Sequence, residues 1–267
     1  MTSDHRGADA EFYVGYLPQQ PPGIARWVRR TVLALGVLAV GLAALLVVAQ
    51  RPFAAAFFEY GTVREFAGRI QEGPAPVLWL ARPGEAAGTA SGELRSAYYL
   101  VAPGKHGAGP LVAGLDGREV RLRSTLIYRG GQTMLEVEPG SVAPLAPAPA
   151  AGSGSPAAAA SEPVGRVTLD GRIVDSKCYL GVMNFGEGKP HCDCAVRCIV
   201  GGIPPLLVVD EPGVGVRTIF LTGSGGRAIN AEVLDYVAEP VRLMGELKRL
   251  DGKLVLEAEP AEIQRLR

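Results

Sequence analysis

The sequence predicts a mainly β protein, in which one N-terminal transmembrane helix precedes two small five-stranded barrels of the OB type. Three observations predict this architecture: a long uncharged apolar run near the N-terminus, a segment that occurs twice, and a cysteine-rich stretch that only the second copy contains. The predicted ranges are a cytoplasmic tail over 1–25, an anchor over 26–51, a first barrel over 52–139, a linker over 140–163 and a second barrel over 164–267.

The anchor is predicted from residues 31–50, which are apolar throughout, carry no charge and have about the length of a helix that crosses a bilayer. Three arginines lie between residues 26 and 30, whereas Arg51 stands alone after the run. The positive-inside rule therefore places the tail in the cytoplasm and both barrels outside the inner membrane, in the periplasm. A cleavable signal peptide is the alternative, because alanines 54–56 suit a peptidase, but the run exceeds the usual apolar region of about 7–15 residues.

The overall charge argues against a nucleic-acid partner. Lys and Arg together number 27, as do Asp and Glu, so the chain has no net charge to attract a polyanion.

Outside the cysteine-rich stretch, the sequence does not bring nucleophile, base and acid together at a motif spacing. We therefore expect no nucleic-acid binding and no autonomous enzyme, but an integral membrane protein with a membrane-protein partner.

Two segments of the chain, residues 119–139 and 240–260, match each other without a gap. Each copy alternates apolar residues on both sides of Gly-Gly or Asp-Gly, dipeptides that supply the positive φ of tight turns. Both copies therefore predict a β-hairpin, and an internal duplication explains the match. The residues of the first copy that recur unchanged in the second are Val120, Arg121, Leu122, Leu126, Gly131, Leu135, Glu136, Glu138 and Pro139.

Upstream of each hairpin, weaker matches predict three further short strands. In the second copy, residues 231–237 predict a short helix with Asn230 as its N-cap. Three strands, a helix and two strands follow the order of the OB-fold, a five-stranded Greek-key barrel. A pair of generic small β-sandwich domains is the alternative. Between the copies, the Ala-, Pro-, Gly- and Ser-rich residues 140–163 predict a semi-extended spacer.

The second copy contains an insertion, residues 175–205, between its first two strands. The first copy joins these strands in a few residues, whereas this stretch holds all four cysteines and one of the three histidines. A barrel that stands without the stretch in one copy does not need it for its core, which favours a site. Residues 193–200 predict a helix that ends at two glycines, with Cys194 and Cys198 one turn apart on one face.

Three kinds of chemistry fit these residues. In an oxidising compartment, disulfides such as Cys178 with Cys194 or Cys198 would staple the long insertion. A metal site of Cys178, His191, Cys194 and Cys198 would hold zinc or copper(I) through thiolates and an imidazole, with Cys192 as an additional candidate. The third is thiol–disulfide or nucleophilic chemistry, with Cys194 near a helix N-terminus that lowers its pKa and His191 as its base.

Two stretches resemble known bacterial proteins. Asp175-Ser-Lys-Cys178, then His191, Cys194-Ala-Val-Arg-Cys198 and Gly-Gly-Ile-Pro-Pro over 201–205 resemble the signature of exported bacterial domains with Asp-Ser-x-Cys, a histidine and Cys-x3-Cys. Residues 12–18, Phe-Tyr-Val-Gly-Tyr-Leu-Pro, resemble the cytoplasmic start of single-span bacterial proteins associated with membrane redox systems. The resemblance implies bacterial origin, export and a site at the cysteines, but no particular reaction. Cys192 departs from the pattern.

The sequence therefore predicts a single-pass, membrane-anchored, exported accessory protein that serves as an assembly or interaction subunit of a membrane redox system. Its Cys/His site is expected to be either stapled by disulfides or metal-binding. The alternative functions are a thiol–disulfide oxidoreductase and a copper- or zinc-handling protein. An enzyme predicts an accessible thiol of low pKa, whereas a metal site predicts thiols that become alkylatable after chelation.

Overall fold

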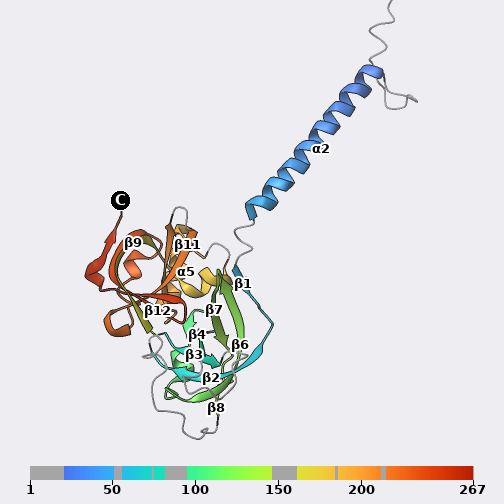
Figure 1. Cartoon of the computed structure of the whole chain (residues 1–267). Coiled ribbons are helices and arrows are strands. Elements are labelled where there is room, and N and C mark those ends of the chain that lie inside the picture. Colours follow the sequence, from blue (N-terminus) through green and yellow to red (C-terminus); the bar gives the residue numbers. More distant parts are fainter. Residues whose placement is uncertain are drawn as a thin grey trace, which may run out of the picture. The chain divides into compact units, whose positions relative to one another are not determined.

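The computed structural model describes residues 21–50, 56–73, 75–81, 95–145, 161–183, 186–211 and 215–266, and the chain divides into two units, Met1–Ala54 and Ala55–Arg267. The first unit contributes helix α2 (Pro22–Gln50), drawn in blue in Figure 1. Its stretch Pro22–Ala49 is long and apolar enough to cross a membrane, as an anchor or a signal sequence is. Most of the predicted tail lies outside the described residues, so its cytoplasmic location stays a prediction.

The first barrel closes on itself through five strands. Strand β2 pairs with β3 and β6, and β3 pairs with β4. Strand β7 completes the ring, because it pairs antiparallel with β6 and parallel with β4. The five strands are β2 (Arg64–Gln71), β3 (Val77–Ala81), β4 (Arg95–Ala102), β6 (Glu119–Arg129) and β7 (Gln132–Val137). Shorter elements are β1 (Ala56–Phe58), β5 (His106–Gly107), β8 (Ala143–Pro144) and the one-turn helix α3 (Gly109–Val112).

The second barrel repeats this connectivity. Strand β9 pairs with β10 and β12, β10 pairs with β11, and β13 closes the ring against β12 and, in parallel, against β11. These strands are β9 (Ser161–Asp175), β10 (Pro205–Glu211), β11 (Gly215–Thr222), β12 (Pro240–Leu250) and β13 (Lys253–Glu257), and β14 (Ile263–Arg265) adds to β12. Two five-stranded closed barrels with parallel third and fifth strands confirm the predicted OB-like fold.

The duplication is also visible in how each barrel bends. Gly68 and Gly171, which are equivalent in the two first strands, lie against a carbonyl of the neighbouring strand. A Cβ atom would lie 2.3 Å from the Trp79 oxygen at Gly68 and 2.5 Å from the Val208 oxygen at Gly171. Only glycine allows the strand to coil this closely at the same place in both barrels.

The short helix predicted over residues 231–237 forms only in part. The structure has turns there, followed by a single 3-10 turn, η5 (Leu234–Tyr236). Asn230 does not cap it, because its side-chain amide donates to the carbonyls of Ile199 and Ile203 instead. Val237 pairs with Ile173 of β9, so the segment is tied to the barrel where a longer helix would have to continue.

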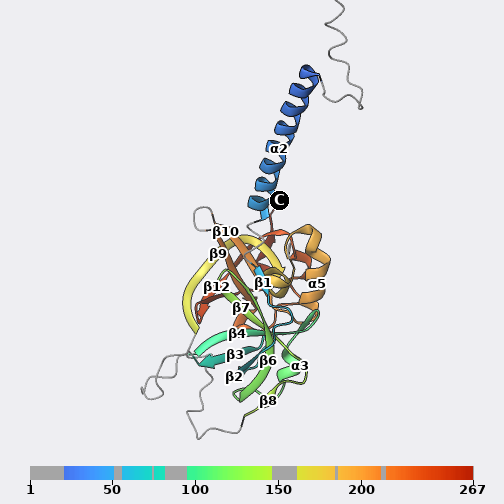
Figure 2. The ribbon, with the colours of Figure 1, turned by 90° about the vertical axis from the view of Figure 1, so that its right-hand side faces the viewer.

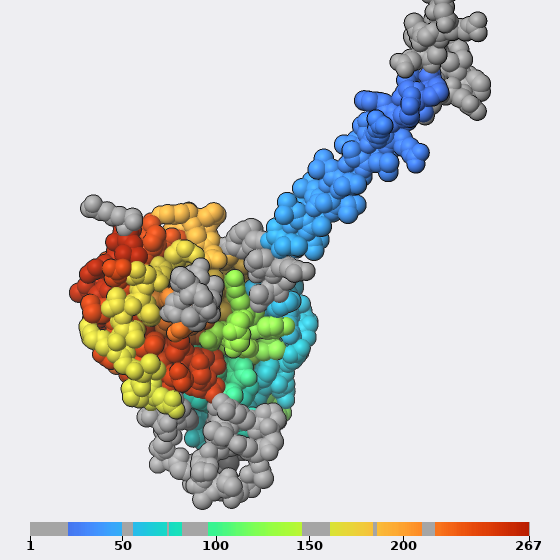
Figure 3. All heavy atoms as spheres, turned by 45° about the horizontal axis from the view of Figure 1, so that its top comes forward, coloured from blue at the N-terminus to red at the C-terminus, as the bar shows by residue number. Residues whose placement is uncertain are grey.

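The two barrels pack together within the unit Ala55–Arg267. One hydrophobic cluster contains residues of both, and the rings of Tyr99 and Phe220 lie 4.0 Å apart between centroids. Figure 3 shows the first barrel, in cyan and green, in contact with the yellow and red second barrel. Strand β9 begins at Ser161, inside the predicted linker, and residues 146–160 of that linker lie outside the described part. The composition of the linker did not predict this packing.

Candidate metal centre

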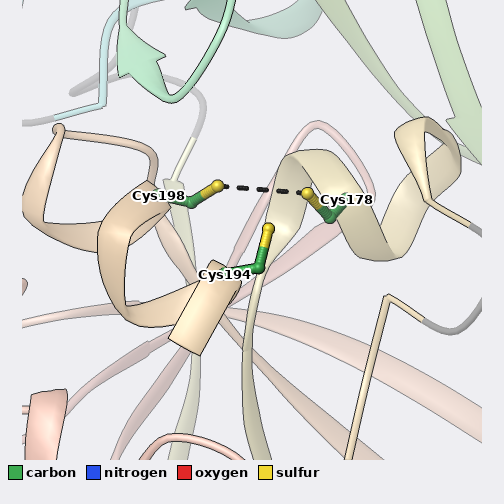
Figure 4. Close-up of side chains that lie close together, drawn as sticks. All are labelled: Cys178, Cys194 and Cys198. Carbon is green, nitrogen blue, oxygen red and sulfur yellow. Dashed lines mark hydrogen bonds between the residues drawn. The ribbon is translucent and has the colours of Figure 1, made fainter. Parts of the chain in front are cut away.

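Two helical elements of the insertion bring three cysteines together. The short turn η2 (Cys178–Val182) follows β9, and helix α5 (Cys192–Val200) carries Cys194 and Cys198 on one face, at the junction of the barrels (Figure 2). Figure 4 shows the three side chains, one from η2 and two from α5, pointing toward one another. Their Sγ atoms all lie within 4.8 Å of one another, which is a spacing that can hold one metal ion.

Asp175 and His191 stand beside Cys178 in the protein interior. Asp175 is fully buried at the end of β9, and its Oδ1 accepts the backbone N–H of Cys178 at 2.8 Å. Its Oδ2 accepts a hydrogen bond from Nε2 of His191 at 3.1 Å. The Asp-Ser-Lys-Cys spacing thus lets one carboxylate fix both the turn that carries Cys178 and the ring of His191.

The predicted ligands fall into two groups rather than one. Cys178, Cys194 and Cys198 form the first, and Asp175, Cys178 and His191 form the second, so His191 reaches the sulfurs only through Cys178. Cys192 belongs to neither group: its Sγ lies 3.5 Å from the carbonyl oxygen of Val237, and it packs against the core of the second barrel. Cys192 begins α5, and its side chain therefore points away from the sulfurs of Cys194 and Cys198.

The sulfur geometry fits a shared metal ion. All four cysteines are free thiols, so the predicted disulfide staple is not confirmed. Sγ of Cys178 and Sγ of Cys198 lie 3.9 Å apart, whereas a disulfide bond is about 2.05 Å long. Two thiolates at about 2.3 Å from one metal ion lie about 3.8 Å apart in a tetrahedron and about 4.0 Å apart in a planar trigonal site. The separation suits either coordination.

A lysine from the first barrel completes the surroundings of the sulfurs. Nζ of Lys105 lies 2.6 Å from Sγ of Cys194 and 3.9 Å from Sγ of Cys198. The hydrogen bond to Cys194 raises the pKa of Lys105, so its ammonium stays charged. The sequence could not reveal this contact, because 89 residues separate Lys105 from Cys194 and no spacing pattern relates them.

The pKa values of the two most buried thiols, Cys178 and Cys198, shift in opposite directions. Their mutual hydrogen bond, then burial and the nearby Asp175 carboxylate, raise the pKa of Cys178. The same hydrogen bond, helped by the positive charge of Lys105, lowers the pKa of Cys198. These pKa shifts favour a protonated Cys178 thiol next to a Cys198 thiolate.

Lys177 also joins the barrels, although its place beside Cys178 in a polar stretch predicts a solvated loop charge. Its side chain is only 2% exposed and forms a salt bridge with Glu136 of β7. Nζ of Lys177 also donates to the carbonyl oxygens of Ala102 at 2.7 Å and Gly104 at 2.8 Å. The turn that carries Cys178 is thereby fastened to the first barrel.

Solvent reaches the sulfur group from one side. Cys178 and Cys198 are 4% and 1% exposed, whereas Cys194 is partly exposed. Lys105, which is also partly exposed, lies against Cys194. An ion or a thiol reagent therefore meets Cys194 and Lys105 before it meets the buried pair.

Comparisons with known proteins add no function. The chain matches no protein-family model and no curated protein sequence. Among solved structures, it is similar to the wild-type single-stranded DNA binding protein from Thermus aquaticus, with 16% identity over 77% of this chain and 92% of that chain and a TM-score of 0.22. A deletion mutant of that protein matches with 14% identity over 80% and 96% of the two chains, also with a TM-score of 0.22. At these TM-scores the similarity carries no argument.

Proposed function

We propose that this chain is a membrane-anchored, exported accessory protein whose cysteine insertion binds a metal ion that thiolates coordinate well, zinc or copper(I). Cys178, Cys194 and Cys198 are its ligands. The observation that carries the proposal is the convergence of three sulfurs from two separate elements, with 3.9 Å between the two buried ones. Thiolates are the ligands that select these metals, and either ion accepts a sulfur separation of this size.

The surrounding residues support a metal centre in distinct ways. Asp175 fixes the backbone at Cys178, so one sulfur is held in place before an ion arrives. Helix α5 holds the other two at a one-turn spacing that backbone hydrogen bonds maintain. His191 is oriented by Asp175 next to Cys178 and would support that ligand rather than complete a four-ligand set with Cys194 and Cys198.

The apolar helix supports the accessory role. Helix α2 has the length and composition of a membrane anchor, and the resemblance of residues 12–18 to single-span proteins implies a membrane redox system as the assembly that the chain serves. The orientation with both barrels in the periplasm follows from the arginines at 26–30. A protein of this kind would hold or pass on a metal ion beside the membrane.

One observation favours a second candidate, a dithiol that is oxidised and reduced in a thiol–disulfide exchange. Cys178 and Cys198 lie next to each other, and the lowered pKa of Cys198 favours its thiolate. Oxidation would join their sulfurs and transfer two electrons and two protons to a disulfide of a partner, which becomes a dithiol.

Metal content separates the two candidates. The full chain, purified in detergent without oxygen, is loaded with zinc or with copper(I), desalted and analysed for metal per chain. We expect about one ion per chain for the unaltered protein and loss of that ion in Cys194→Ser and Cys198→Ser. Cys192→Ser is the matched control, because Cys192 lies outside the sulfur group, and it should bind like the parent.

Two results would contradict the metal proposal. The first is a chain that binds neither ion and carries a Cys178–Cys198 disulfide in peptide mass spectra. The second is equal loss of metal in Cys192→Ser and in Cys194→Ser. The first result would leave a disulfide between these two cysteines, either as a structural staple or as the dithiol of the second candidate.

A further inference from the structure

The cysteine insertion holds one particular turn of the first barrel, residues 102–107, which joins β4 to β5. Lys177, next to Cys178, donates to the carbonyls of Ala102 and Gly104 in this turn. At the other end of the insertion, the carbonyl of Gly201 accepts the backbone N–H of Gly107 at 2.9 Å. The turn is therefore fixed from both sides, and Lys105 lies between these two attachments.

Glycine at position 201 is needed for this attachment. Gly201 ends α5 with φ −72°, a conformation that any residue adopts, so backbone strain does not require a glycine. A Cβ atom there would lie only 1.8 Å from the carbonyl oxygen of Lys105, and a Cβ atom on Gly107 would lie 2.3 Å from the oxygen of Gly202. The two backbones approach so closely that only glycines fit, and this approach brings Lys105 to the sulfurs.

The charge of a filled site explains why an ammonium group belongs there. Three thiolates around zinc carry a net charge of −1, and around copper(I) a net charge of −2. A net charge in a largely buried site is unfavourable unless an opposite charge lies close. Lys105 supplies one positive charge at 2.6 Å from Cys194 and 3.9 Å from Cys198.

We propose that Lys105 is a functional member of the metal centre, supplied by the first barrel as the counter-charge of the metal–thiolate group, so that docking of that barrel and metal binding support each other. This inference rests on the proposed function of the sulfur site. It assigns the first barrel a role: the copy without cysteines contributes a cation to the sulfurs of the cysteine-bearing copy. Lys105 acts through the sulfurs and is a positioning residue, not a ligand.

The test compares variants of Lys105 in the full chain in detergent. Zinc and copper(I) affinities are measured by competition with a chromophoric chelator. Lys105→Met, which keeps an apolar stem and loses the charge, should bind about 10–100-fold more weakly, the range found when groups that support metal ligands are removed. Lys105→Arg keeps the charge and should restore most of the affinity. Lys248→Met is the matched control. Lys248, like Lys105, is partly buried and has its Nζ 2.6 Å from a partner atom, but that partner is Glu257 rather than a sulfur.

Two further measurements test the coupling. Gly201→Ala should weaken metal binding as Lys105→Met does, because the added methyl group displaces the turn that carries Lys105. Metal should raise the unfolding temperature of the parent more than that of Lys105→Met, because a ligand stabilises in proportion to its affinity for the folded state. A purely structural lysine would lower the unfolding temperature equally with and without metal.

The outcomes are distinguishable. If the parent chain binds metal and Lys105→Met binds it with the same affinity, the role of Lys105 is refuted while the metal centre stands. If Lys105→Arg is as weak as Lys105→Met, charge is not what Lys105 contributes, and the inference is refuted as well. If the parent binds neither metal, the proposed function fails and this inference falls with it.

Discussion

Replacement of Lys177 by methionine should destabilise the two-barrel unit strongly, although Lys177 lies outside the sulfur group. Its side chain is 2% exposed, and its partner Glu136 is 15% exposed. The variant leaves the Glu136 carboxylate without its cation and removes the hydrogen bonds that Lys177 donates to the carbonyls of Ala102 and Gly104. Breaking a buried ion pair from one side costs about 3–5 kcal/mol, and the residual exposure of Glu136 places the expected cost near about 3 kcal/mol.

The assay is thermal unfolding followed by the fluorescence of Trp79, which is 2% exposed in the first barrel. The other tryptophan, Trp27, lies on α2 and is 68% exposed. For a domain of 150–250 residues, about 1 kcal/mol shifts the unfolding temperature by about 2–4 °C, so Lys177→Met should lower it by about 6–12 °C.

A second variant isolates the buried charge. In Lys177→Met with Glu136→Gln, no carboxylate remains unpaired, so the pair of changes should recover at least about 1 kcal/mol relative to Lys177→Met alone. Asp170→Asn is the control for an ion pair with half-exposed side chains, because Asp170 binds Arg242 at the surface, and it should change stability little. A loss in Lys177→Met below about 1 kcal/mol, or additive losses in the double variant, would show that the buried ion pair of Lys177 and Glu136 does not stabilise the unit in this way.

The remaining predictions concern the barrels and the anchor. Gly68→Ala and Gly171→Ala should each lower the free energy of unfolding by about 1–3 kcal/mol, because the added methyl group meets a carbonyl of the adjacent strand. Gly109→Ala is the control, because Gly109 has open space around it, and it should change thermal stability little. Equal effects of all three substitutions would contradict this prediction. Burial raises the pKa of Tyr99, so the folded state holds the hydroxyl proton more tightly than the unfolded state does. The contribution of this proton to the free energy of unfolding is therefore complete below the unfolded pKa of about 10 and is lost progressively as the pH rises above that value. Unfolding free energies at successive pH values above 10 should therefore fall more steeply for the parent than for Tyr99→Phe, and parallel curves would contradict the assignment. Protease added to spheroplasts should digest the barrels, and digestion only in inverted vesicles would reverse the predicted orientation.

Local patterns in the amino-acid sequence are enough to predict several features of this protein. The apolar run predicts a membrane-spanning helix because about 20 uncharged residues match a bilayer, and α2 covers that run. The repeated hairpin predicts two copies of one barrel because alternation and turn glycines are local signals, and both barrels close with the same strand order. The one-turn spacing of Cys194 and Cys198 likewise places both on one face of α5.

The surroundings of the sulfurs depend on contacts between segments that are far apart in the sequence, so local patterns do not predict them. Lys105 and Glu136 belong to the first barrel and meet the insertion only because the barrels dock, and no period in the sequence relates residues so far apart. The motif suggested one set of four ligands, but in the structure His191 bonds to Asp175 and groups with Asp175 and Cys178, whereas Cys194 and Cys198 group with Cys178 alone. The helix expected after Asn230 is reduced to the 3-10 turn η5, and the Asn230 side chain binds the carbonyl of Ile199 in α5 rather than capping that turn. Spacing along a chain sets which residues share a turn or a face, whereas packing between distant segments sets which charges and sulfurs meet.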